Sequence, residues 1–110
     1  MYSAAYLFLS ALILVQTYAP PVKLATIADS AINESSGLVA SRTNSGAYWT
    51  HNDSGGGPFI YALDTNGETL GTFRVNGATN RDWEDIAAGP GPQHGRSYLY
   101  IGDIGDNDQK

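Results

Sequence analysis

The sequence predicts an all-β protein built from antiparallel four-stranded units, and two observations lead to this prediction. Short runs rich in aromatic and β-branched residues are separated by clusters of Gly, Pro, Asn, Asp and Ser, which is the pattern of strands joined by turns. One segment also recurs after about 50 residues, a period typical of the blades of a β-propeller. We therefore expect antiparallel meander blades of a β-propeller, of which the chain supplies about one and a half.

The repeat consists of an apolar strand, an aromatic strand and an acidic residue beside each of them. The aligned strand segments are 38–40 with 86–88 and 48–55 with 98–105. The aligned acidic residues are Glu34 with Asp82 and Asp53 with Asp103. Because the carboxylates recur together with the strands, we interpret the two segments as copies of one structural unit.

Residues 1–19 have the layout of a secretory signal peptide. The stretch 4–15 is almost wholly apolar, and Ala19 offers a small residue at the cleavage position before two prolines. About twelve apolar residues are too few for a membrane-spanning helix, which takes about 20. We expect a cleaved signal-peptide helix, a secreted protein and no membrane span after cleavage; an uncleaved anchor and a buried core helix are the alternatives.

Residues 20–35 are expected to form an extended lead-in segment. Pro20 and Pro21 bias its start away from helix, and residues 25–32 could be either extended or a helical turn. Residues 36–75 follow as the first blade. Its predicted strands span 38–41, 47–51, 59–64 and 68–75. The turn at 65–67 contains the Asn-Gly pair that is the strongest short-range signal for a hairpin.

Residues 76–110 are expected to form the first half of a second blade. Its predicted strands are 83–88 and 97–101, separated by a Gly and Pro loop at 89–92. A closed propeller contains about four to eight blades, so we expect the 110 residues to be the front piece of a longer protein. The alternative is an open sheet that must find another partner for its edges.

The composition argues against a polyanionic partner and against a disulfide framework. The chain carries eleven acidic and six basic residues, for a net charge of -5, and the basic residues are scattered along it. Binding to a nucleic-acid backbone requires clustered Lys and Arg, so nucleic acid is not an expected partner. The chain has no cysteine, so a packed core has to stabilise it.

Carboxylates gather where the repeat brings strand boundaries together. Glu34 and Asp82 precede the first strand of each repeat, Asp53 and Asp103 follow the second strand, and Asp106 comes shortly after. In a propeller these positions lie at one mouth of the central channel. The same rim is expected to hold Glu84, Asp85 and Asn107.

Oxygen ligands without sulfur suit a hard cation, with Ca²⁺ first and Mg²⁺ next. The predicted metal ligands are Glu34, Asp53, Asp82, Asp103 and Asp106.

Several polar residues also have a structural interpretation. Asp and Asn are common in turns, where their side chains accept backbone hydrogen bonds, and each predicted ligand could be such a turn former. Asp29 and Asp64 are expected to be structural only. His51 is expected to be packed rather than catalytic, and Trp83 to anchor the core. No Gly-x-Ser-x-Gly motif is present, and no residue is assigned a catalytic role.

Four segments, 34–38, 49–55, 82–87 and 100–107, together resemble the opening blades of a group of secreted, largely uncharacterised β-propeller proteins. That group is distantly similar to gluconolactonase-like, NHL-repeat and soluble quinoprotein dehydrogenase propellers. In gluconolactonase-like propellers a glutamate before the first inner strand holds a divalent cation, and Glu34 matches that position. The other ligands of that family come from later blades.

The resemblance implies a cation at the channel mouth that serves either the structure or the hydrolysis of an ester or lactone. If hydrolysis occurs, a metal-bound water would be the nucleophile. The alternative is a non-catalytic extracellular module whose aromatic-lined face binds a protein or a glycan. Quinone-dependent oxidoreduction fits less well, because the basic and histidine residues that it needs are scarce.

Overall fold

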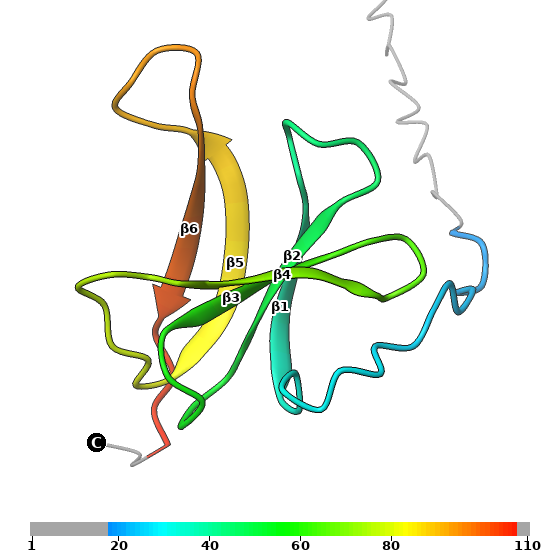
Figure 1. Ribbon diagram of the computed structural model, residues 1–110, viewed down its shortest axis with the longest axis horizontal. Helices are drawn as coiled ribbons and strands as arrows, with labels where there is room; N and C mark the ends of the chain where they lie inside the picture. The colour runs from blue at the N-terminus through cyan, green and yellow to red at the C-terminus, as the bar shows by residue number, and fades with distance from the viewer. Residues whose placement is uncertain (1–17, 108–110) are drawn as a thin grey trace, which may run out of the picture.

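The computed structural model describes residues 18–107, and this part of the chain forms β-strands and no helix. The strands are β1 (Ser35–Ala40), β2 (Tyr48–Asn52), β3 (Phe59–Leu63), β4 (Thr69–Arg74), β5 (Trp83–Pro90) and β6 (Ser97–Asp103). They form one antiparallel sheet of four strands and another of two (Figure 1). The predicted all-β class is confirmed. The predicted signal-peptide helix falls on residues 1–19, of which 1–17 lie outside the described part.

Within residues 18–107, no helix has the length and the apolar character needed to cross a membrane.

The four-stranded sheet is a meander in the order β1-β2-β3-β4, and each strand pairs antiparallel with the next. The turn between β3 and β4 contains the predicted Asn-Gly pair, and Gly67 has the positive φ of 81° that this turn requires. Oδ1 of Asp64 accepts the backbone N–H groups of Asn66 at 2.8 Å and of Glu68 at 2.9 Å. The predicted hairpin is confirmed, and the Asp64 side chain holds its turn.

The β5 and β6 strands pair antiparallel in a sheet of their own. The sequence predicts a loop at 89–92, but β5 continues through Gly89 and Pro90, which lie opposite Tyr98 and Ser97. Proline is tolerated here because β5 is an edge strand and Pro90 is its last residue. The carbonyl of Pro90 accepts the Tyr100 hydroxyl. The predicted start of the loop is therefore wrong, and the connection spans residues 91–96.

The extended lead-in segment covers one face of the four-stranded sheet. The core on this face contains Ile32, Tyr61 and Leu63, which are all buried. Asp29 ties the segment to the sheet, because its Oδ2 accepts the Thr69 hydroxyl at 2.7 Å and its Oδ1 accepts the N–H of Ala31 at 2.9 Å. These bonds, that to Thr69 most of all, lower the pKa of Asp29.

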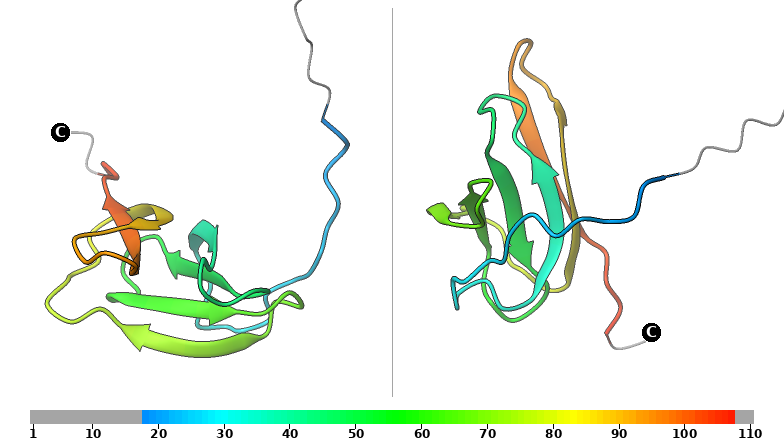
Figure 2. Two further views of the ribbon diagram at one scale, coloured as in Figure 1. Left: turned by 90° about the horizontal axis from the view of Figure 1, so that it is seen from above. Right: turned by 90° about the vertical axis from the view of Figure 1, so that its right-hand side faces the viewer.

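The opposite face of the four-stranded sheet packs against β5, which lies beside β1 (Figure 2). Gly37 makes this approach possible, since a Cβ there would lie 2.9 Å from Nε2 of His51 and 2.9 Å from the backbone N of Ile86. The His51 ring is fully buried and meets the Trp83 ring edge to face, with 5.6 Å between centroids. Ser36 Oγ donates to the Trp83 carbonyl at 2.7 Å. The two sheets therefore share a tightly packed contact.

The internal repeat is visible in the strand pairing, because both sheets carry the same irregularity. One extra residue interrupts the ladder near the start of the first strand of each repeat: Ser36 in β1 and Glu84 in β5. The flanking pairs are Ser35 with Asn52 and Gly37 with His51 in the first repeat, and Trp83 with Asp103 and Asp85 with Gly102 in the second. Such β-bulges bend a strand and redirect its side chains.

The pairing also corrects one detail of the predicted repeat, because Asp103 takes the position of Asn52 rather than that of Asp53. The two equivalent side chains make the same hydrogen bond. Asn52 Oδ1 accepts the N–H of Glu34 at 3.2 Å, and Asp103 Oδ1 accepts the N–H of Asp82 at 2.9 Å. The sequence alignment matched aspartate with aspartate, whereas the backbone matches the two residues that accept this bond.

Candidate metal site

Three carboxylates converge where the first repeat ends its second strand and the second repeat begins its first. Asp53, Asp82 and Glu84 each offer an oxygen, and these oxygens all lie within 4.8 Å of one another. Asp82 is buried, Asp53 is half-buried and Glu84 is exposed. The cluster could therefore hold a cation that reaches it from solvent.

Backbone hydrogen bonds fix the segments that carry the cluster. The N–H of Asp53 donates to the Glu34 carbonyl at 2.8 Å, and the Asp53 carbonyl accepts the N–H of Trp83 at 3.2 Å. The chain at Asp53 is thus tied to the residue before β1 on one side and to the start of β5 on the other. This double attachment brings a carboxylate of the first repeat to the two carboxylates that flank Trp83.

The chain that follows β6 folds over the Asp82 side chain. Asn107 donates its backbone N–H to Asp82 Oδ2 at 3.1 Å and its side-chain amide to Oδ1 at 2.8 Å, while the N–H of Gly105 donates to the Asp82 carbonyl at 3.1 Å. A Cβ at Gly105 would collide with the Asp82 carboxylate and would lie 2.6 Å from Glu84 Oε1. Only glycine lets this segment pass so close to the cluster.

Asp53 has a buried carboxylate oxygen that the described part of the fold leaves without a hydrogen bond. Its Oδ1 is buried and has no hydrogen-bond partner among residues 18–107. A hydrogen bond between its carboxyl group and that of Asp82 raises the pKa of Asp53, and burial and the charges of Glu84, Asp82 and Glu34 raise it further. The site therefore disfavours a third negative charge unless a proton or a cation compensates it.

The remaining predicted ligands lie around this cluster rather than in it. Glu34 is exposed, and its charge acts on Asp53. Asp103 and Asp106 line a hollow of about 330 Å³ beside Asp82, and Asp103 uses Oδ1 to cap the backbone there. Two of the five predicted ligands, Asp53 and Asp82, are thus in the cluster that the geometry brings together.

Glu84 completes the cluster, although the sequence indicated only that it lies on the rim. It is the extra residue of the β5 bulge. Simple alternation along a strand does not foresee where a bulged side chain points. One feature of the sequence could have indicated it. Asp82 and Glu84 are two residues apart on either side of the buried Trp83, so both carboxylates are expected on the side of the chain opposite the tryptophan.

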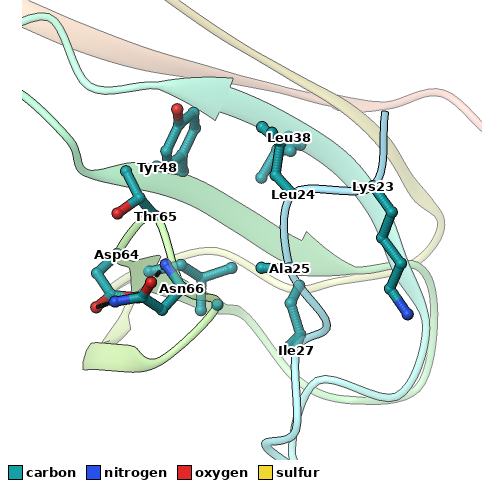
Figure 3. Close-up of a pocket in the computed structure, with 11 residues that line it drawn as sticks. Lys23, Leu24, Ala25, Ile27, Leu38, Tyr48, Asp64, Thr65 and Asn66 are labelled. Atoms are coloured by element: carbon teal, nitrogen blue, oxygen red, sulfur yellow. Dashed lines mark hydrogen bonds between the residues drawn. The ribbon is translucent and has the colours of Figure 1, made fainter. Parts of the chain in front are cut away.

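A separate hollow of about 680 Å³ lies between the lead-in segment and the four-stranded sheet (Figure 3). Its lining is mostly apolar and includes Leu24 from the segment and Leu38 of β1. Among the residues that line it the single carboxylate is Asp64, which already accepts the hydrogen bonds of the β3–β4 turn. This hollow therefore offers no metal site.

No protein-family model, curated protein or solved structure matches this chain.

Proposed function

We propose that this chain is part of a secreted β-propeller protein and that it binds a divalent cation through Asp53, Asp82 and Glu84. The observation that carries the proposal is the convergence of three carboxylate oxygens within 4.8 Å, one carboxylate of which has a buried oxygen without a hydrogen-bond partner in the described part of the chain. A cation would supply that partner. It would also offset the negative charges of Glu84, Asp82 and Glu34, which add to the rise in the pKa of Asp53 that the hydrogen bond with Asp82 and burial cause first.

Ca²⁺ is the proposed ion and Mg²⁺ the next candidate. The donors are carboxylates, and hard divalent cations prefer oxygen ligands. Ca²⁺ accepts six to eight oxygens in irregular geometry, whereas Mg²⁺ demands a near-ideal octahedron. Protein carboxylates on one side and solvent on the other suit the less demanding ion, and Glu34 is close enough for its charge to act on the same site.

The propeller assignment rests on the repeat. A four-stranded meander is followed by two further strands, β5 and β6, whose pairing has the same bulge as the pairing of β1 with β2. In both pairs, the last residue of the second strand accepts the N–H of the residue that lies directly before the first strand. Asp53 belongs to the first repeat, and Asp82 and Glu84 belong to the second. A cation at this position would therefore join successive blades at the rim of a channel.

Hydrolysis of an ester or lactone is the activity that we propose for the intact protein, on the basis of the resemblance to gluconolactonase-like propellers. A divalent cation would supply Lewis-acid activation for this chemistry. This chain would contribute the carboxylates that hold the ion. The alternative is a non-catalytic extracellular module that binds a protein or a glycan and uses the ion for structure alone.

The test is thermal melting of the full chain in EDTA and in rising Ca²⁺. At a concentration about 100 times the Kd, a ligand that binds only the folded state stabilises it by about 2.7 kcal/mol. For a domain of this size the melting temperature should then rise by roughly 10–20 °C. Asp53→Asn should remove most of this rise, because it removes a ligand charge while preserving side-chain shape.

Glu68→Gln is the matched control. It removes one negative charge from the β3–β4 hairpin, and the Glu68 side chain is exposed. The proposed site would be contradicted if Ca²⁺ still raised the melting temperature of Asp53→Asn. It would also be contradicted if the rise disappeared equally in Glu68→Gln. Hydrolysis of a panel of lactones by the intact protein in the presence of Ca²⁺, lost in Asp53→Asn, would favour the hydrolase over the binding module.

A further inference from the structure

A second polar hollow lies between the β1–β2 and β5–β6 connections. These two connections point to the same end of the molecule, at the top of Figure 1, and the chain that follows β6 lies at the opposite end. The hollow measures about 420 Å³ and is lined by residues 42–43 of one connection and by residues of the segment 89–97. It is thus formed jointly by the two repeats, at the end remote from the carboxylate cluster.

The charge of this hollow is opposite to that of the whole chain. Arg42, His94 and Arg96 line it, and its lining contains no carboxylate among the described residues. The chain has only six Lys and Arg residues against eleven acidic ones, yet two of its four arginines face this one hollow. Such a concentration of positive charge is not expected from the composition.

The donors that surround the hollow are free. The guanidinium groups of Arg42 and Arg96 have no hydrogen-bond or ion-pair partner within residues 18–107. The backbone N–H groups of Gln93, His94 and Gly95 likewise have no acceptor in that part of the chain. Two guanidinium groups and three consecutive backbone N–H groups could therefore donate hydrogen bonds to an anion.

The segments that carry these donors are held in place. The N–H of Arg96 donates to the Gln93 carbonyl at 3.2 Å, in a turn whose Gly95 has a φ of 75°. The ring of Tyr98 occupies the space that a Cβ at Gly91 would need, so it packs directly on the chain there. On the other side Ser41 Oγ accepts the N–H of Thr43 and of Asn44. Turns fixed in this way limit the entropy lost when a ligand binds.

We propose that this hollow binds a single tetrahedral oxyanion, the phosphate or sulfate group of a small molecule. The guanidinium groups of Arg42 and Arg96 offer paired N–H donors that match its oxygens, and the N–H groups of residues 93–95 complete the coordination. A long polyanion is not the ligand, because two arginines on a chain of net charge -5 cannot neutralise a series of phosphates.

The experiment is a titration of the ¹⁵N-labelled full chain with inorganic phosphate, followed by its amide shifts. The buffer contains EDTA and has constant ionic strength, so that the carboxylate cluster plays no part. Saturable shifts are expected for residues 42–43 and 93–96. Each of Arg42→Gln and Arg96→Gln should weaken binding at least tenfold, since a hydrogen bond to a charged group is lost, and the double variant should abolish saturation.

Arg74→Gln is the matched control, because it removes the same charge from a guanidinium that lies over the Phe59 ring, 5.8 Å from its centroid. Its affinity for phosphate should equal that of the unaltered chain. Shifts that remain saturable in the double variant, or that sodium chloride reproduces, would overturn the proposal, and the spectra themselves report whether each variant is folded.

The same titration is repeated with sulfate and with acetate in place of phosphate. Tighter binding of phosphate would point to a phosphate ester as the natural ligand, and tighter binding of sulfate to a sulfate ester. Equal binding of both would support a site for tetrahedral oxyanions in general. Equal binding of acetate would contradict the tetrahedral class.

Discussion

The two repeats share a backbone design but differ in the residue that completes it. In each, a side chain at the end of the second strand accepts the N–H of the residue before the first strand. Asn52 does so in the first repeat and Asp103 in the second. Asn52 is buried and also donates its amide to the Ala31 carbonyl at 2.8 Å, whereas Asp103 is exposed. The same hydrogen bond is thus made by a neutral group inside the fold and by a charged group at its surface.

This difference explains why the carboxylates gather between the repeats instead of forming one site in each. The first repeat uses an amide where a charge would be buried, and it contributes Asp53 from one residue further along. The second repeat contributes Asp82 and the bulged Glu84. The two repeats therefore share a single candidate site at their boundary.

Exchanging the two accepting residues should have the largest effect. Asn52→Asp would bury a carboxylate facing the Ala31 carbonyl and remove the donor of that bond. One carboxylate oxygen would keep the N–H of Glu34, but the other would face the Ala31 carbonyl without a donor, which should cost about 3 kcal/mol. Asp103→Asn keeps an oxygen for the N–H of Asp82 and should change stability by about 0.5 kcal/mol or less, as most exposed substitutions do. Urea unfolding of both variants measures this asymmetry, and equal losses would contradict it.

A smaller loss is expected from adding one methyl group where the sheets meet. Gly37→Ala places a Cβ 2.9 Å from both His51 Nε2 and the backbone N of Ile86, and such overpacking costs about 1–3 kcal/mol. Gly102 lies on the second strand of the other repeat, where a Cβ would approach Ile104 Cδ1 at 3.4 Å and Cγ1 at 3.5 Å, which are ordinary contacts. Gly102→Ala is therefore the control.

Thermal melting should show a loss for Gly37→Ala and almost none for Gly102→Ala. If both melt alike, the close approach of β5 to β1 is not what gives Gly37 its role.

The smallest effect concerns pH and the first repeat. The N–H of Glu68 lowers the pKa of Asp64 most, although burial opposes it, and the amide groups of Asn66 lower it further. A lowered folded-state pKa stabilises the fold above the unfolded pKa, near 3.9, and this contribution is lost as the pH falls through the folded-state pKa. Asp53 has a raised pKa, so its effect has the opposite sign.

Asp64→Asn should therefore lower the melting temperature at pH 6. The difference from the unaltered chain should shrink as the pH falls through the folded-state pKa of Asp64, because the Asp64 carboxylate then takes up a proton. Asp29→Asn should behave in the same way, because its pKa is also lowered. A pH-independent difference between either variant and the unaltered chain would refute this assignment.

Much of the fold could be predicted because its signals are local. The Asn-Gly pair fixed the β3–β4 hairpin, and aromatic and β-branched runs located the strands. The register of β6 relative to the first repeat could not be obtained in this way. A shift of one residue leaves the composition of a strand unchanged, and only its partner strand decides the register.

Part of the candidate site could also be predicted, because the positions of Asp53 and Asp82 follow from the strand boundaries. Asp53 and Asp82 end and begin strands, so topology alone brings them together. Glu84 depends on a bulge and Gly105 on a close approach of the chain, and both are set by tertiary packing. The two arginines of the second hollow were missed because Arg42 and Arg96 are far apart in the sequence, and only the fold brings their connections together.

The β5–β6 ladder continues through Gly89 and Pro90, beyond the point that corresponds to Ala40, where the β1–β2 ladder ends opposite Tyr48. The extra residue pairs lie at the end of the β5–β6 ladder that is farther from its bulge. The two repeats can therefore differ in strand length at the end that carries the β1–β2 and β5–β6 connections, while the bulge and the hydrogen bond beside it stay the same at the other end.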